Sequence, residues 1–325
     1  MARDTIVTGS KLTTLANAIR TKGGTSSQMT LDQMAQAVAA IPTGGGGGGF
    51  TPTTLAYALQ YGTEIDFSGV DVSKLVPANS SYQKFQAGSG EYMCYSNTHR
   101  GRVDMLPLSG YTFGAFSHAF LDSAYITSID NMDAVSFVLY SGESFGNVFR
   151  RCTRLETVRF GNNFTWCSSY GDITFESDFE DCYALQDVKM PTVSVPTGAN
   201  VGINLVSTFK NTNNLTEVDL SPFDACTGTL QLLNSFSGSA KKTIIMPANI
   251  SKISRYYGTG SCIGGCDADV IFTQTTPPTL SAYNVFFTSG YNCRIFVPDA
   301  AVADWQSATN WAQYASQIYP VSDLQ

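Results

Sequence analysis

The chain has 325 residues, a formal net charge of -7 and only 14% charged residues. This length holds one large or two ordinary domains with ample apolar material for a core. The low charge content leaves a neutral, polar surface, which can hydrogen-bond to sugars but also serves simply to keep fibrous or extracellular proteins soluble. There is no basic run and no apolar stretch near the about 18 residues of a membrane span, so we expect neither nucleic acid binding nor membrane insertion.

Residues 1–43 predict a helical hairpin. A first helix ends at Gly24, and Thr30 with Gln33 forms the capping box of a second helix that ends at Pro42. The apolar stripes of the two helices comprise Leu12, Leu15, Ile19, Leu31, Met34 and Val38. Two such helices bury too little surface to fold alone. We therefore expect the stripes to mediate attachment or oligomerisation, with sister chains or a different protein as the partner.

Residues 44–51 follow as a polyglycine linker, a flexible tether that lacks the G-K-[ST] sequence of a phosphate-binding loop. The helical stretch before it, with the turn A-I-R-x-K-G-G at residues 18–24, is similar to the opening of tail-associated proteins in phages and prophages of Firmicutes. This resemblance implies that residues 1–43 attach the protein to other tail or baseplate proteins. Residues 52–112 show no repeat, and we assign them to an N-terminal cap or transition region.

A repeated apolar pattern begins near residue 113. Its units are anchored at Phe120, Phe149, Phe179, Phe209, Phe236 and Phe287. The three central phenylalanines stand 30 residues apart, and each is followed at +6, +9 and +11 by a leucine, a valine and an apolar residue. A unit this short must stack on its neighbours to bury its apolar face, which predicts a solenoid over 113–298. An apolar residue four positions before each phenylalanine indicates a helical turn, and the valine segment indicates a strand.

The order Phe149, Cys152, Leu155, Val158, Phe160 resembles the BspA-type leucine-rich repeat of bacterial surface proteins and phage tail proteins. The usual repeat of that family is shorter, so the extra residues here must form longer connections or a second strand on each coil. Residues 299–325 resemble the closing helix of such domains, whose aromatic residues seal the last coil. The predicted fold class is therefore α+β: an N-terminal helical hairpin, then a β-rich, BspA-like leucine-rich-repeat solenoid with a C-terminal capping helix.

The cysteines and histidines give little sign of chemistry. Cys152 and Cys182 occupy equivalent repeat positions, where small buried thiols pack well, although an even count of eight is also compatible with disulfides. The pair Cys262 and Cys266 lacks the further ligands of a zinc site. The two histidines have no partners at the spacing of a metal or catalytic motif. We expect no metal and no cofactor.

The best enzymatic candidate is the carboxylate cluster Glu176, Asp178, Glu180 and Asp181. Two facing carboxylates can hydrolyse a glycosidic bond. These four, however, fall on polar positions of the repeat, which favours a solvated surface over a catalytic site.

Three tyrosines in loop-like sequence, Tyr170, Tyr256 and Tyr257, are the predicted receptor contacts. An exposed tyrosine ring stacks on the face of a sugar while its hydroxyl stays solvated. Packing beneath loops is the alternative role for these side chains.

The combined prediction is a non-enzymatic phage tail fibre or receptor-binding structural protein, located in the virion and extracellular after release. It would dock through residues 1–43 and contact a host surface glycan or protein with its repeats. The opening residues lack the apolar core of a signal peptide, which fits release by lysis. A trimer is favoured over separately attached monomers. The alternatives are a bacterial cell-surface adhesin and a cell-wall polysaccharide depolymerase.

Overall fold

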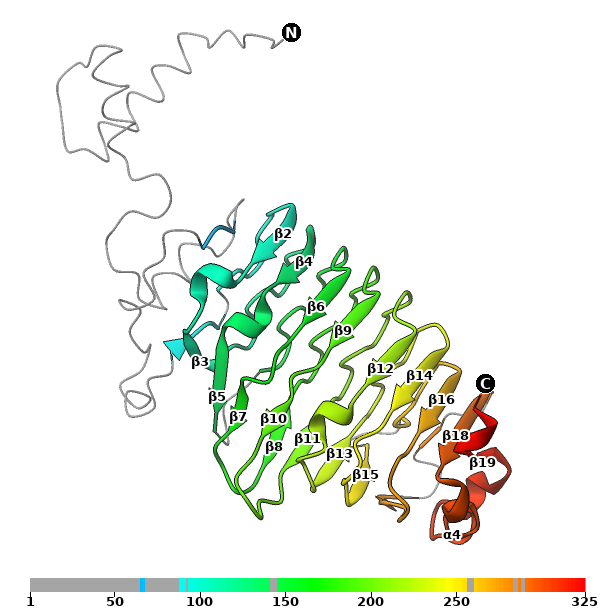
Figure 1. The fold of residues 1–325 in the computed structure, drawn as a ribbon. Coiled ribbons are helices and arrows are strands. Elements are labelled where there is room, and N and C mark those ends of the chain that lie inside the picture. Colours follow the sequence, from blue (N-terminus) through cyan, green and yellow to red (C-terminus); the bar gives the residue numbers. More distant parts are fainter. Residues whose placement is uncertain are drawn as a thin grey trace, which may run out of the picture. The chain divides into compact units, whose positions relative to one another are not determined.

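The computed structural model describes residues 65–67, 88–91, 93–140, 145–255, 260–282, 286–287 and 290–324 (Figure 1). The predicted helical hairpin at 1–43, with its stripe residues from Leu12 to Val38, and the linker at 44–51 lie outside these ranges. The predicted domain boundaries stay predictions.

The described chain forms four parallel β-sheets. Sheet A runs in the order β1 (Gly88–Ser89), β3 (Thr112–Ala115), β5 (Ser136–Leu139), β7 (Phe164–Trp166), β10 (Val193–Ser194). Sheet B runs in the order β2 (Gly101–Asp104), β4 (Ile126–Asp130), β6 (Thr157–Arg159), β9 (Asp187–Lys189). Sheet C runs in the order β17 (Thr279–Leu280), β15 (Lys252–Ser254), β13 (Thr229–Gln231), β11 (Gly202–Asn204), β8 (Asp172–Thr174). Sheet D runs in the order β12 (Glu217–Asp219), β14 (Lys242–Ile245), β16 (Ala268–Ile271), β18 (Cys293–Val297), β19 (Ile318–Pro320).

The chain winds in successive turns, which we call coils, and each coil contributes to more than one sheet. The coil that starts at β6 passes through β7 and β8 before it returns to β9, which pairs with β6 in register. Strands of sheets B and D therefore follow one another down one wall of the stack, as Figure 1 shows. In each three-residue strand of sheet C the central residue is buried and points inward. In sheet C the aligned inward residues are Ile173, Ile203, Leu230, Ile253 and Leu280, all buried.

Sheet A, sheet C, and sheets B and D together form three walls of the stack. A fourth wall consists of the segments that carry the repeat phenylalanines. We call them the ladder segments: 116–123, 145–152, 175–182, 205–212 and 232–239. They hydrogen-bond to one another between coils; Phe149 N, for example, donates to Asp178 O at 3.0 Å, and Phe179 N to Thr208 O at 2.9 Å. In every ladder segment the residues two before and two after the phenylalanine have positive φ. These are His118 and Asp122, Asn147 and Arg151, Ser177 and Asp181, Ser207 and Asn211, Asn234 and Gly238.

The core is a column of stacked aromatic rings. Phe120, Phe149, Phe179, Phe209 and Phe236 lie face to face, with ring centroids 5.5, 5.4, 5.6 and 5.6 Å apart and every ring buried. The repeat spacing thus correctly placed five of the six predicted phenylalanines above one another. It was wrong for Phe287, which contacts Phe286 and Tyr314 instead. Leu155, Leu185 and Leu215 are also buried, at the turn after each ladder segment.

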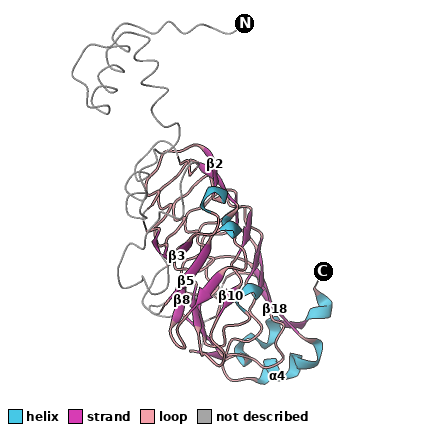
Figure 2. Cartoon of the chain, turned by 60° about the vertical axis from the view of Figure 1, so that its left-hand side comes forward, coloured by secondary structure: helices cyan, strands magenta, loops and turns pink. Residues whose placement is uncertain are grey.

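The predicted fold class is wrong for the described residues, which form a parallel-sheet fold and not a leucine-rich-repeat solenoid. The described helices are short: α4 (Val302–Ser307) and the 3-10 helices η3 (Leu106–Leu108), η4 (Met132–Ala134), η5 (Ser221–Phe223), η6 (Asp299–Ala301), η7 (Ala312–Gln317) and η8 (Val321–Asp323) (Figure 2). The spacing of four residues that indicated a helical turn belongs to the ladder segments. Their positive-φ residues exclude a helix.

The single C-terminal capping helix is also a wrong prediction. The segment breaks into η6 and α4, a left-handed Asn310 with φ +63°, and η7. It continues into β19, which adds a strand to sheet D, and then into η8. Its aromatic residues do close the core, because Trp305 and Trp311 are buried against Phe272 at centroid distances of 4.7 and 5.7 Å.

Candidate functional site

Because the strands of sheet C are parallel, the segments that precede them lie side by side at the same end of the strands. We call this surface the sheet C rim; it is made of residues 167–171, 198–201, 226–228, 248–251 and 273–278. Backbone hydrogen bonds join each rim segment to the next. They are Gly202 N to Gly171 O at 3.0 Å, Gly228 N to Val201 O at 2.9 Å, Ser251 N to Gly228 O at 3.2 Å and Thr279 N to Ser251 O at 2.9 Å. The rim is thus a continuous surface of loops on a fixed sheet.

A groove of about 730 Å³ lies between the last two rim segments and is lined by residues 248–251 and 273–279. Its lining carries hydroxyl groups from threonine and serine, amide groups from Asn249 and Gln274, and apolar surface from Ile250 and two prolines. None of these lining residues is titratable. Exposed hydroxyl groups and the exposed side chain of Asn249, on a partly apolar floor, suit a neutral ligand that is rich in hydroxyl groups.

The two walls of the groove are held in place by hydrogen bonds. Gln274 Nε2 donates to Thr276 O at 2.6 Å and to Ile250 O at 3.5 Å, so one side chain bridges both walls. Behind the second wall, Trp305 Nε1 donates to Thr275 O at 3.0 Å and Trp311 Nε1 to Pro278 O at 2.6 Å. The C-terminal segment therefore both closes the core and fixes the groove.

Of the three predicted receptor tyrosines, only Tyr170 lies in the described chain. It is on the rim, two residues before β8, and is the most exposed large apolar side chain among the described residues, at 68%. Tyr256 and Tyr257 follow β15 in the chain and lie outside the described residues. The structure thus places Tyr170 on the rim that holds the groove, but several coils away from it.

A polar bridge crosses sheet C next to Tyr170. Gln231 Nε2 donates to Asp172 Oδ2 at 2.5 Å, over β11, and only a glycine fits beneath, since a Cβ on Gly202 would lie 2.1 Å from Asp172 Oδ1. Burial raises the pKa of the Asp172 carboxyl, and the Gln231 hydrogen bond opposes the rise. The bridge fixes three coils relative to one another at this part of the rim.

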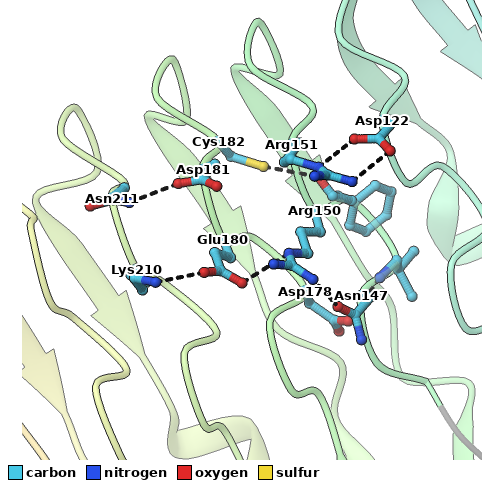
Figure 3. A network of polar contacts seen from close by, with 12 residues as sticks. Asp122, Asn147, Arg150, Arg151, Asp178, Glu180, Asp181, Cys182, Lys210 and Asn211 are labelled. Carbon is cyan, nitrogen blue, oxygen red and sulfur yellow. Dashed lines mark hydrogen bonds and ion pairs between the residues drawn. The ribbon is translucent and has the colours of Figure 1, made fainter. Parts of the chain in front are cut away.

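The carboxylate cluster that was the best enzymatic candidate lies on the ladder segments, where its members bind protein groups (Figure 3). Glu180, only 6% exposed, is bridged by Arg150 Nε at 2.9 Å and Lys210 Nζ at 2.8 Å. Asp181 accepts hydrogen bonds from Asn211 Nδ2 at 2.7 Å and from the hydroxyl of Tyr183 at 3.3 Å. These carboxylates link one coil to the next.

The prediction that these four carboxylates lie on a solvated face is wrong for Asp178 and Glu180, which are buried. Asp178 is 1% exposed and accepts a hydrogen bond from Val148 N at 3.0 Å in the coil before. Burial raises the pKa of Asp178 well above its usual value, the hydrogen bond lowers it, and the charge of Glu176 raises it further. Glu176 itself accepts from Asn204 Nδ2 at 3.3 Å. Sequence position did not reveal that a polar residue of the repeat could be buried between coils.

All eight cysteines are free thiols. Cys152 Sγ donates to Phe120 O and Cys182 Sγ to Phe149 O, each at 3.1 Å, and burial raises the pKa of both thiols. The prediction that these two equivalent cysteines are buried packing residues is confirmed. Cys262 and Cys266 are buried as well. Within the described ranges, no three histidine, cysteine, aspartate or glutamate side chains gather as a metal site would require.

His99 is a structural residue: its Nδ1 accepts from Ile65 N at 3.2 Å, and its Nε2 lies 3.0 Å from Arg102 O. Burial lowers the pKa of His118, the second histidine, in the first ladder segment. None of the helices that the structure describes combines the length and apolar character that a bilayer crossing demands.

Sequence reasoning missed the groove. Its only signal is the run TQTTPPT at 273–279, which is polar, free of charge and outside the apolar repeat. Comparison with known proteins adds no assignment, since no family model and no curated protein matches the chain.

Proposed function

We propose that the protein is a non-enzymatic attachment protein of a phage tail, which binds a neutral glycan of the host surface with its sheet C rim. The observation that carries the proposal is the groove at residues 248–251 and 273–279. It offers hydroxyl groups and the exposed side chain of Asn249 without a titratable side chain, so it is equipped to bind a sugar and has no general acid or base for its hydrolysis.

The state of the carboxylates supports the same choice. A glycosidase needs one carboxyl group free to donate a proton and another free to attack or to activate water. Glu180 and Asp181 are held by Arg150, Lys210 and Asn211 from neighbouring coils. In this proposal the cluster stabilises the stack, and Tyr170 extends the contact surface along the rim as a stacking platform.

Attachment to the tail belongs to residues 1–43, by their resemblance to tail-associated proteins. Linked copies, in the trimer that is common among fibres, would let several weak rim contacts act together. Location in the virion is part of the same proposal.

The test is binding of the purified full chain to host cells and to isolated cell-wall glycan. The variant Thr273→Val/Thr276→Val removes two exposed groove hydroxyls while it keeps side-chain shape. Loss of two hydrogen bonds of about 1 kcal/mol each predicts a roughly tenfold to thirtyfold weaker affinity. Thr157→Val/Thr243→Val makes the same chemical change on the outer faces of sheets B and D and should bind as wild type.

Two results would contradict the proposal. The first is a groove variant that melts like wild type and binds host glycan with unchanged affinity. The second is the release of new reducing ends from the glycan by the wild-type protein, which would favour the depolymerase. Tyr170→Ala tests separately whether the contact surface extends along the rim.

A further inference from the structure

Two arginines flank one tyrosine on the turns that lead into sheet B. The guanidinium carbon of Arg100 lies 4.4 Å from the centroid of the Tyr125 ring, and that of Arg154 lies 5.4 Å from it. Arg100 directly precedes β2, Tyr125 directly precedes β4, and Arg154 lies in the turn before β6. Because β4 is between β2 and β6 in sheet B, the two arginines reach the ring from the coils on its two sides.

The backbone around the ring is fixed by neighbouring coils. Tyr125 O accepts a hydrogen bond from Gly101 N at 3.2 Å, and Ala124 O accepts from Thr153 Oγ1 at 3.3 Å. Tyr125 is half-buried, whereas both arginines are exposed. The arrangement is therefore anchored at its centre and open to solvent at its two charged groups.

The arginines on this ring differ from most other described arginines, which are neutralised by carboxylates. The ion pairs are Arg102 with Asp130, Arg150 with Glu180, Arg151 with Asp122, Arg159 with Asp187, and Arg294 with Asp269. Arg100 and Arg154 form no ion pair with any described carboxylate, including Glu156, the acidic residue closest to Arg154 in sequence. Two positive charges thus remain uncompensated at one place on a chain whose net charge is -7.

Stacking on an aromatic ring engages the flat face of a guanidinium and leaves its edge, with its N–H donors, free. Such an edge matches the oxygens of a phosphate or carboxylate and can hold them with two parallel hydrogen bonds. Contact with the Tyr125 ring limits the motion of both arginine side chains, so a ligand loses less conformational freedom when it binds.

We infer that Arg100, Tyr125 and Arg154 form an oxyanion-binding site for a phosphate or carboxylate group carried by a surface polymer of the host. This site is separate from the neutral groove of the sheet C rim and does not depend on it. Tyr125 is a positioning residue, and the arginines contact the ligand. Repeated anionic groups on one polymer would allow several copies of the protein to bind it together.

The experiment measures binding of the full chain to three immobilised polymers: poly(glycerol phosphate), polygalacturonate and neutral dextran, at low and at moderate salt. Arg100→Gln/Arg154→Gln should lower affinity for the anionic polymer at least tenfold. The matched control Arg102→Gln/Arg159→Gln removes the same charge from two paired arginines and should change affinity less than threefold. Tyr125→Leu keeps both charges, and it should weaken binding because it removes the support between them.

Binding to either anionic polymer with this pattern supports the site, and the polymer that binds tells phosphate from carboxylate recognition. Equal loss in both double variants would overturn it, because the binding would then follow net charge alone. Failure of wild type to bind either anionic polymer at low salt would overturn it as well. Host-cell binding of the same variants separates the two proposals: retained groove-dependent binding without polymer binding refutes only the oxyanion site.

Discussion

Lys242, the first residue of β14, offers a sharp test of how the coils are held together. Its side chain is fully buried, and its ammonium group donates to the carbonyl oxygens of Thr212, at 2.8 Å, and of Leu215, both in the preceding coil. Burial lowers the pKa of Lys242 from 10.5 to about 8, and the neighbouring Cys266 opposes the change. No carboxylate among the described residues pairs with it.

The sign of the pH dependence follows from this shift. Between pH 8 and 10.5 the unfolded chain holds the lysine proton more tightly than the folded chain does, so the contribution of Lys242 to stability rises with pH. The full shift corresponds to about 3.4 kcal/mol, of which about 2.5 kcal/mol develops between pH 7 and pH 10. The buried cysteines act in the opposite direction, because burial raises the pKa of their thiols, so only a comparison of variants isolates the lysine.

The comparison uses Lys242→Met, which cannot titrate. Urea unfolding, followed by the fluorescence of the buried tryptophans, gives the free energy of unfolding at pH 7 and at pH 10. The stability of wild type relative to the methionine variant should increase by about 2.5 kcal/mol over this interval. The exposed Lys252 provides the control, and Lys252→Met should run parallel to wild type. A Lys242→Met variant that also runs parallel, within about 0.5 kcal/mol, would refute the reasoning.

Three further substitutions, the first with a matched control, probe the stack by the same unfolding assay. Phe179→Ala removes a ring from between two others and should cost about 3 to 5 kcal/mol, whereas Tyr183→Ala, at an exposed ring in the next turn, should cost less than about 1 kcal/mol. Gly202→Ala would place a Cβ 2.1 Å from Asp172 Oδ1 and 2.7 Å from the backbone oxygen of Thr229, and it should destabilise the protein by about 1 to 3 kcal/mol; an unchanged midpoint would contradict this close packing around Gly202. Ser207→Gly removes the side chain from a left-handed residue and should stabilise by up to about 1 kcal/mol, so a loss of stability would contradict the φ of +56°.

Sequence spacing identified the core better than it identified the fold. The phenylalanines at 30-residue intervals lie in one ring column, since any architecture that stacks equivalent units places equivalent side chains above one another. The period does not reveal how many strands each coil contains. The extra residues between Phe160 and Phe175 were open to two interpretations, and they form β7 and β8 in two different sheets.

The groove and the Arg100, Tyr125 and Arg154 cluster could not be predicted from the sequence for a different reason. Residues 248–251 and 273–279 are joined by parallel pairing of β15 with β17, and the cluster by pairing of β2, β4 and β6. Neither set shares a motif, because its members meet only after the register between coils is set. Tyr170 could be proposed from sequence alone because an aromatic residue among serines and glycine signals exposure by itself.

The failed helix assignment shows where a usable signal was present. Apolar residues four apart, such as Phe145 and Phe149, suit one helical turn, yet here they face the core from a ladder segment built of turns. The difference is set two residues away, at Asn147 and Arg151, whose φ values of +60° each are incompatible with a right-handed helix. Asparagine, aspartate and glycine, which tolerate this conformation best, stand at one or both of these positions in all five ladder segments. A spacing of four with such residues two positions on either side of the phenylalanine therefore predicts a stacked ladder, and a spacing of four without them predicts a helix.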